Sequence, residues 1–104
     1  MPPYADPLSH KEIEDRLAEL PGWSLSDDGT SLVRTYRLPH IPAAVFVVHI
    51  AQIQDELNHH SDLTLGYHSI AVSITTHAAG GRLTERDFGL AQRIEAIAPA
   101  HGAA

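Results

Sequence analysis

The sequence predicts an α+β domain: a four-stranded antiparallel sheet with three helices packed on one face, in the order helix, two strands, helix, two strands, helix. Three observations support this prediction. Three segments repeat apolar residues at helical spacing, shorter segments between them alternate apolar and polar residues, and Asp28-Gly29 is a hairpin turn signal. The 104 residues fit a single domain, 1–104, in which we expect 1–8 and 99–104 to be irregular.

The first helix is predicted to begin at a capping box formed by Ser9 and Glu12. Its apolar stripe is Ile13, Leu17 and Leu20. The sequence "ELPGW" then ends it, because proline and glycine both interrupt helices. Two short strands are expected between Trp23 and Leu38, joined at the Asp28-Gly29 turn.

Pro42 is well placed for the first turn of a second helix, which is expected to reach about Leu57. Its predicted apolar stripe is Phe46, Ile50, Ile53 and Leu57. A second hairpin follows, with a turn expected at His68-Ser69. Its alternating apolar residues are Leu63, Leu65 and Tyr67 in one strand and Ile70, Val72 and Ile74 in the other.

The last helix is predicted to have Thr84 as its N-cap. Its apolar residues are Leu90, Ala91, Ile94, Ile97 and Ala98. The chain after Pro99 is expected to fray, because proline cannot continue the helical hydrogen-bond pattern.

The composition excludes several classes of protein. Seven Lys and Arg stand against thirteen Asp and Glu, so the net charge of −6 argues against direct binding to nucleic acid. The absence of cysteine rules out disulfides and thiolate metal sites. The first residues do not resemble a secretory signal, and no apolar run is long enough to cross a bilayer. We therefore expect a cytoplasmic protein.

Three of the eight histidines lie in one stretch of the sequence: His59, His60 and His77. The first two follow the second helix, and the third follows the second hairpin, which can bring it back towards them. Imidazole titrates near neutral pH, so such a group suits acid–base catalysis, and neutral imidazole is also a common zinc ligand. Three unrelated surface histidines are the remaining alternative at this point.

The segments "NHHSD", "TTHAAGG" and "LTERDFGLAQ" together resemble the pterin-4a-carbinolamine dehydratase family. In that family a double histidine precedes a hairpin, [ST]-T-H-x-x-G-G, L-[ST]-E-x-D and the last helix. The resemblance extends over nearly the whole chain and includes Gly22-Trp23, Phe46 and Tyr67. It implies the fold predicted above and assembly into a homodimer or homotetramer.

The resemblance also implies a hydro-lyase that dehydrates a 4a-hydroxytetrahydropterin to the quinonoid dihydropterin, within the recycling of tetrahydrobiopterin or a related pterin. His59 and His77 would then act on the C4a hydroxyl and the N5 proton, and His60 would hold the pterin. Asp87 would orient a neighbouring histidine, or simply favour the first turn of its helix. No metal or organic cofactor is implied, and a pterin-dependent hydroxylase would belong to the same pathway.

Further substrate contacts are expected from Asp55 and from the backbone at Gly80 and Gly81. The sequence departs from the family pattern at Ser61, where proline is usual, at Leu63, where an aromatic residue is usual, and at Asp55, where glutamate is common. Arg82 lengthens the loop before the last helix by one residue. Two alternatives to catalysis stay open: a non-catalytic dimerisation or assembly module of the same fold, and a metal site formed by the histidines and Asp87.

Overall fold

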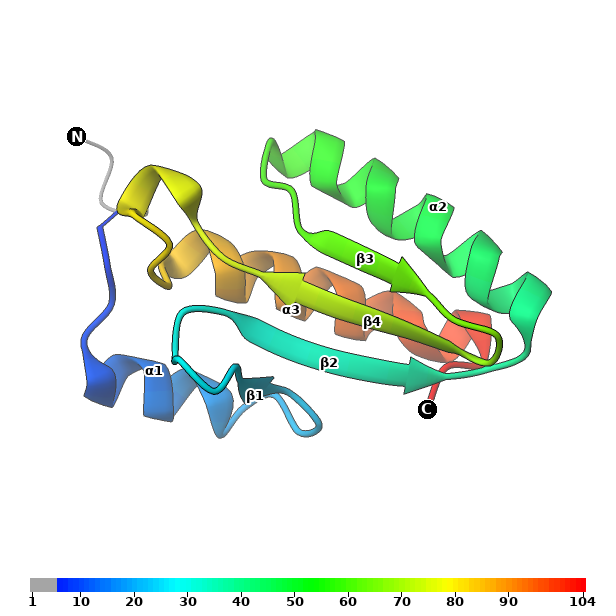
Figure 1. Ribbon diagram of the computed structural model, residues 1–104, viewed down its shortest axis with the longest axis horizontal. Helices are drawn as coiled ribbons and strands as arrows, with labels where there is room; N and C mark the ends of the chain where they lie inside the picture. Colours follow the sequence, from blue (N-terminus) through cyan, green and yellow to red (C-terminus); the bar gives the residue numbers. More distant parts are fainter. Residues whose placement is uncertain (1–5) are drawn as a thin grey trace.

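The computed structural model describes residues 6–104, and its elements follow the predicted order (Figure 1). The helices and strands are α1 (His10–Leu17), β1 (Ser24–Leu25), β2 (Leu32–Arg37), α2 (His40–Leu57), β3 (Asp62–Leu65), β4 (Ser69–Ile74) and α3 (Glu85–Ile97). Two short 3-10 helices, η2 (His77–Ala79) and η3 (Ala98–His101), flank α3. Of the ends expected to be irregular, residues 1–5 lie outside the described part of the chain.

The four strands form one antiparallel sheet in the order β1-β2-β4-β3. Helix α2 connects β2 to β3, and β4 lies between these two strands. Ile70 of β4 pairs with Tyr36 of β2, and Val72 of β4 pairs with Leu63 of β3. In Figure 1, α3 passes behind the sheet, α2 runs alongside β3, and α1 lies beside β1. The predicted α+β architecture is confirmed.

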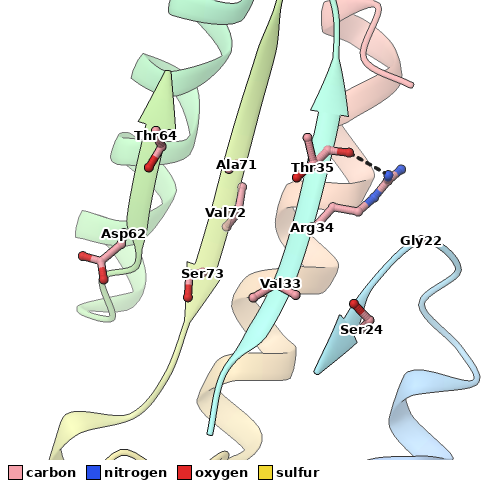
Figure 2. Close-up of a pocket in the computed structure, with 10 residues that line it drawn as sticks. All are labelled: Gly22, Ser24, Val33, Arg34, Thr35, Asp62, Thr64, Ala71, Val72 and Ser73. Carbon is pink, nitrogen blue, oxygen red and sulfur yellow. Dashed lines mark hydrogen bonds between the residues drawn. The ribbon is translucent and has the colours of Figure 1, made fainter. Parts of the chain in front are cut away.

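The face of the sheet opposite α2 and α3 is not covered by any helix of residues 6–104 (Figure 1). Its outward side chains are small or polar, and they line a shallow pocket of about 260 Å³ (Figure 2). Val33 and Thr35 come from β2, and Ala71 and Ser73 come from β4. None of the predicted catalytic residues lines this pocket.

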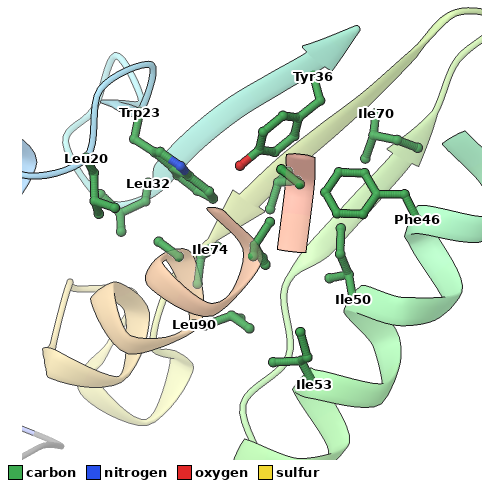
Figure 3. Packing of buried hydrophobic residues seen from close by; sticks show 14 of the residues in the cluster. Leu20, Trp23, Leu32, Tyr36, Phe46, Ile50, Ile53, Ile70, Ile74 and Leu90 are labelled. Atoms are coloured by element: carbon green, nitrogen blue, oxygen red, sulfur yellow. The ribbon is translucent and has the colours of Figure 1, made fainter. Parts of the chain in front are cut away.

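The inward face of the sheet forms the core with α2 and α3 (Figure 3). In β4 the buried residues alternate with partly exposed ones, as a strand covered on one side requires. Tyr36 packs edge-to-face on Phe46 with ring centroids 5.3 Å apart, which joins β2 to α2. The Tyr36 hydroxyl donates to Glu95 of α3, and Trp23 Nε1 donates to the same carboxylate oxygen at 2.9 Å.

The predicted starts of α1 and α3 are confirmed, and Pro42 lies in the first turn of α2, which begins at His40. Ser9 and Glu12 form the capping box of α1, and Thr84 caps α3. Thr84 and Asp87 form a second capping box, at the start of α3. The Asp28-Gly29 turn is confirmed as well, with Gly29 at a φ of 73° that suits glycine.

Two details of the middle of the chain differ from expectation. Leu57 was placed in the buried stripe of α2, but it is 36% exposed at the last position of the helix. The second hairpin turns at Tyr67 and His68 instead of at His68-Ser69. The Gly66 N–H donates to the Ser69 carbonyl at 2.8 Å, and this bond leaves Tyr67 on the turn, 76% exposed.

The end of the chain is ordered, contrary to the irregular 99–104 that we expected. It forms η3, and two backbone hydrogen bonds join Ala104 to Arg37 at the end of β2. The ring of His101 stacks on Phe46 at 5.0 Å and lies 2.8 Å from His49 of α2, measured between ring nitrogens. These tertiary contacts replace the helical hydrogen bonds that Pro99 prevents. No helix within residues 6–104 has the length and apolar character to cross a membrane.

Candidate active site

The centre of the candidate site is a buried pair formed by His59 and Asp87. His59 follows the end of α2, and Asp87 lies in the first turn of α3. The His59 Nε2 atom lies 2.7 Å from Asp87 Oδ1, and the side chains are 8% and 0% exposed. The turn after α2 and the first turn of α3 are thus brought into direct contact through the His59 ring and the Asp87 carboxylate.

The Asp87 carboxylate is held in place by two threonines. Its Oδ2 atom accepts the Thr84 N–H at 2.8 Å and the Thr76 hydroxyl at 2.7 Å. Thr76 and Thr84 also share a hydrogen bond of 2.8 Å between their hydroxyls, and both residues are buried. An ionised carboxylate only accepts hydrogen bonds, so this set of donors fits a charged Asp87. His59 then carries a proton on Nε2 and leaves Nδ1 for another partner.

The turn that carries the two histidines is fixed by residues on both sides. Asn58 ends α2 in the left-handed conformation, with a φ of 50°, and the next N–H, that of His59, donates to the Gln54 carbonyl at 3.0 Å. The Gln54 side chain accepts hydrogen bonds from Ser61. From the other side, the Arg86 guanidinium of α3 donates to the Asn58 carbonyl.

His60 points to a different environment. Its Nε2 atom lies 2.9 Å from Asp55 Oδ1, and these side chains are 56% and 82% exposed. Solvent weakens such a pair, so it orients the imidazole without contributing much to stability. Asp55, expected to contact substrate, is here the partner of His60.

His77 is exposed and begins η2, directly after Thr76. Gly80 and Gly81 follow with positive φ angles of 71° and 77°. Their N–H groups, which we expected to face a pterin, donate instead to the carbonyls of His77 and Thr76 at 3.0 and 3.1 Å. The glycines therefore shape the loop that carries His77, because only glycine adopts this backbone conformation readily.

Arg82, the additional loop residue, pairs through its backbone with Thr76 as an isolated β-bridge. The loop closes at this bridge, so its extra length does not displace Thr76 from Asp87. The Thr76 hydroxyl thus links the loop bearing His77 to the carboxylate that holds His59.

A pocket of about 320 Å³ opens beside His59. Its lining residues are Leu57, Asn58, His59, Arg86 and Gly89. The pocket combines an imidazole and a guanidinium with apolar surface, a combination typical of small-molecule sites. His60 and His77 do not line it in the single chain.

The described residues offer no set of ligands for the alternative hypothesis of a metal site. Within residues 6–104, no three or more histidine, aspartate or glutamate side chains are grouped so that they could hold a metal ion. His59 and Asp87 are bonded to each other, and His60 pairs with Asp55.

Sequence reasoning missed three residues that organise the site: Gln54, Thr76 and Arg86. Each acts on a residue from another element or turn, so helical or strand periodicity carried no signal for these contacts. One signal was available in the sequence: Gln54 lies four residues after Ile50 and next to Ile53, both in the predicted apolar stripe, and the structure buries it to 5% exposure.

Comparison with known proteins identifies the family of the chain. The family model described as "Pterin 4 alpha carbinolamine dehydratase" matches residues 6–97. A Streptomyces avermitilis protein, provisionally named a pterin-4-alpha-carbinolamine dehydratase, is 63% identical over 99 residues, covering 94% of this chain and 96% of its own. A Chloroflexus aggregans protein with the same provisional name is 45% identical over 91 residues, covering 86% and 95%.

Among solved structures, a Brucella melitensis protein described as a transcriptional coactivator/pterin dehydratase superposes with a TM-score of 0.82. It is 26% identical, and the match covers 88% of this chain and 97% of that one. The solved structure has the same fold, and the family model and the sequence relatives show that the chain belongs to the pterin-4a-carbinolamine dehydratase family.

Proposed function

We propose that this protein dehydrates a 4a-hydroxytetrahydropterin to the quinonoid dihydropterin. The observation that carries the proposal is the buried pair of His59 and Asp87 beside a pocket, in a chain that belongs to this family. A charged carboxylate behind an imidazole stabilises the imidazolium that forms when the ring takes up a proton. The pair is thus suited to repeated proton transfer.

The reaction needs two proton transfers. The bond between C4a and the hydroxyl oxygen breaks, the N5 proton leaves, and a double bond forms between C4a and N5 as water departs. We assign these two transfers to His59 and His77, and the orientation of the pterin to His60 with its partner Asp55. A positioned acid or base contributes about 10²–10⁴-fold to such a step.

The test is the dehydration of synthetic 4a-hydroxytetrahydropterin by the purified protein, followed against the spontaneous rate. We expect His59→Ala and His77→Ala each to lower kcat by about 10²-fold or more. His10→Ala, an exposed histidine of α1, is the matched control and should leave the rate unchanged. Comparing the pH profiles of the two active-site variants would assign the acid and the base. A spontaneous rate with wild-type protein would favour a non-catalytic module.

The substrate class also indicates a setting for the protein. A 4a-hydroxytetrahydropterin is the product of a pterin-dependent hydroxylase, so we place this chain after such an enzyme, in the cytoplasm. Measuring whether the protein accelerates a hydroxylase assay that accumulates the carbinolamine would test this.

We further propose that the protein forms a homodimer or homotetramer through α2. Ile41, Val45 and Val48 are 70%, 53% and 62% exposed, and their spacing places them along one side of the helix. A second copy of the same stripe would cover them, since an isologous interface is self-complementary. Light scattering should report an oligomer for the wild type and a smaller species for Val48→Glu. A monomeric wild type would contradict this proposal.

A further inference from the structure

We propose that Gln54 is a positioning residue that fixes the two histidines by clamping the main chain on both sides of His60. This inference deepens the proposed function and rests on it for the choice of substrate. Gln54 lies in the last turns of α2 and is 5% exposed, an unusual position for a polar side chain of this size.

Gln54 engages the turn at two points. Its main-chain carbonyl accepts the His59 N–H at 3.0 Å. Its side-chain Oε1 accepts the Ser61 N–H at 3.0 Å and also the Ser61 hydroxyl. Gln54 therefore accepts hydrogen bonds from the backbone N–H groups of the residues directly before and directly after His60.

The orientation of the Gln54 amide follows from its partners. A backbone N–H can only donate, so the atom facing Ser61 must be the amide oxygen. Both Ser61 donors converge on that oxygen, which ties the end of the turn to α2. Ser61 itself is half-buried, so these bonds are partly shielded from solvent.

The clamp acts on the orientation of the imidazoles through the backbone. The His59 ring must reach the buried Asp87 Oδ1, whereas the ring of the next residue, His60, must reach the exposed Asp55. Asn58, in the left-handed conformation, starts this turn, and Ser61 ends it. A proline at position 61 would restrict the backbone through its own ring, but serine does not. Gln54 supplies that restriction from within the helix.

A double-mutant cycle tests the clamp. Gln54→Met keeps the size and helix preference of the side chain and removes the acceptor. It should lower kcat by about 10-fold or more with a smaller change in KM, since the imidazoles lose their alignment. Ser61→Pro removes both donors, but the proline ring fixes φ at the far end of the turn, so this variant should keep most of the wild-type kcat. In the Ser61→Pro background no donor is left to lose, and adding Gln54→Met should have almost no further effect.

Further variants separate the clamp from a general loss of stability. Gln52→Met, an exposed glutamine on the same helix, is the matched control and should retain wild-type kcat and melting temperature. Ser61→Thr keeps both donors and should also retain activity. Ser61→Ala keeps the N–H and should show an intermediate loss of kcat, which provides a readout if Gln54→Met fails to fold.

Another readout does not depend on turnover. Long-range nitrogen–proton NMR of the imidazole rings should show His59 as a single tautomer with the proton on Nε2 in the wild type, and as a mixture in Gln54→Met. An equal loss from Gln54→Met in the wild-type and Ser61→Pro backgrounds, or an unchanged His59 tautomer, would overturn the clamp. A wild type without dehydratase activity but with the expected NMR change would refute the proposed function and leave the clamp supported.

Discussion

Replacing Asp87 by asparagine gives the sharpest test of how the site works. The two side chains have nearly the same size, but asparagine exchanges one carboxylate oxygen for an NH₂ group. Asp87 Oδ2 receives two donors, from Thr76 and Thr84, and Oδ1 receives one, from His59. The single oxygen of asparagine is expected to stay with the two donors. The NH₂ group would then face His59.

Two N–H groups cannot hydrogen-bond to each other, so His59 must move its ring proton from Nε2 to Nδ1 to accept from the asparagine. The nitrogen that would serve the substrate then carries a proton, and the charge that stabilises the imidazolium is gone. We expect kcat to fall by about 10²–10⁴-fold. The charged hydrogen bond to His59 contributes about 1.5–3 kcal/mol and the neutral one that replaces it about 1 kcal/mol. The net loss of about 1 kcal/mol corresponds to a melting temperature lower by about 4–8 °C.

The assay combines carbinolamine dehydration, thermal unfolding and imidazole NMR on the same protein. Asp27→Asn, at an exposed position in the first hairpin, is the control and should match the wild type in all three. A variant at position 87 that keeps wild-type kcat, or that keeps the His59 proton on Nε2, would refute the role assigned to the carboxylate.

Two further predictions concern the rest of the fold. Burial, and then the nearby charge of His49, lower the pKa of His101 below its usual 6.5, so the unfolded chain binds this proton more readily. The unfolding free energy should therefore fall as pH drops below about 6.5. Urea titrations at several pH values should show a smaller fall for His101→Gln, and an equal pH dependence of the unfolding free energy in both proteins would contradict this. Gly22 has a φ of 90°, and an added Cβ would lie 2.7 Å from the Arg34 guanidinium carbon. Gly22→Ala should thus cost about 1–2 kcal/mol in denaturant unfolding, and an unchanged midpoint would argue against strain there.

Much of the fold could be predicted because its signals are local. The capping box at Ser9, the N-cap at Thr84 and the Asp28-Gly29 turn each depend on residues a few positions apart. Where a signal was chemically weak, the prediction failed. His68-Ser69 has no residue that favours a particular turn, and the hydrogen bond between Gly66 and Ser69 moved the turn by one position.

The tail shows the limit of local rules. Pro99 correctly predicts the end of the regular helix, but local rules do not reveal that Phe46 and His49 of α2 offer a surface for His101. The order of the tail comes from these distant contacts.

The sequence by itself determined the order and type of the elements and the three histidines that resemble a catalytic set, because periodicity, capping and motif spacing are properties of short segments. Only the tertiary structure decided that Asp87 faces His59, that Thr76 holds Asp87, and that Gln54 holds the turn. Each of these contacts joins residues from different elements or turns. Such contacts depend on how α2, α3 and the loop after β4 pack on the sheet, and packing is a property of the whole chain.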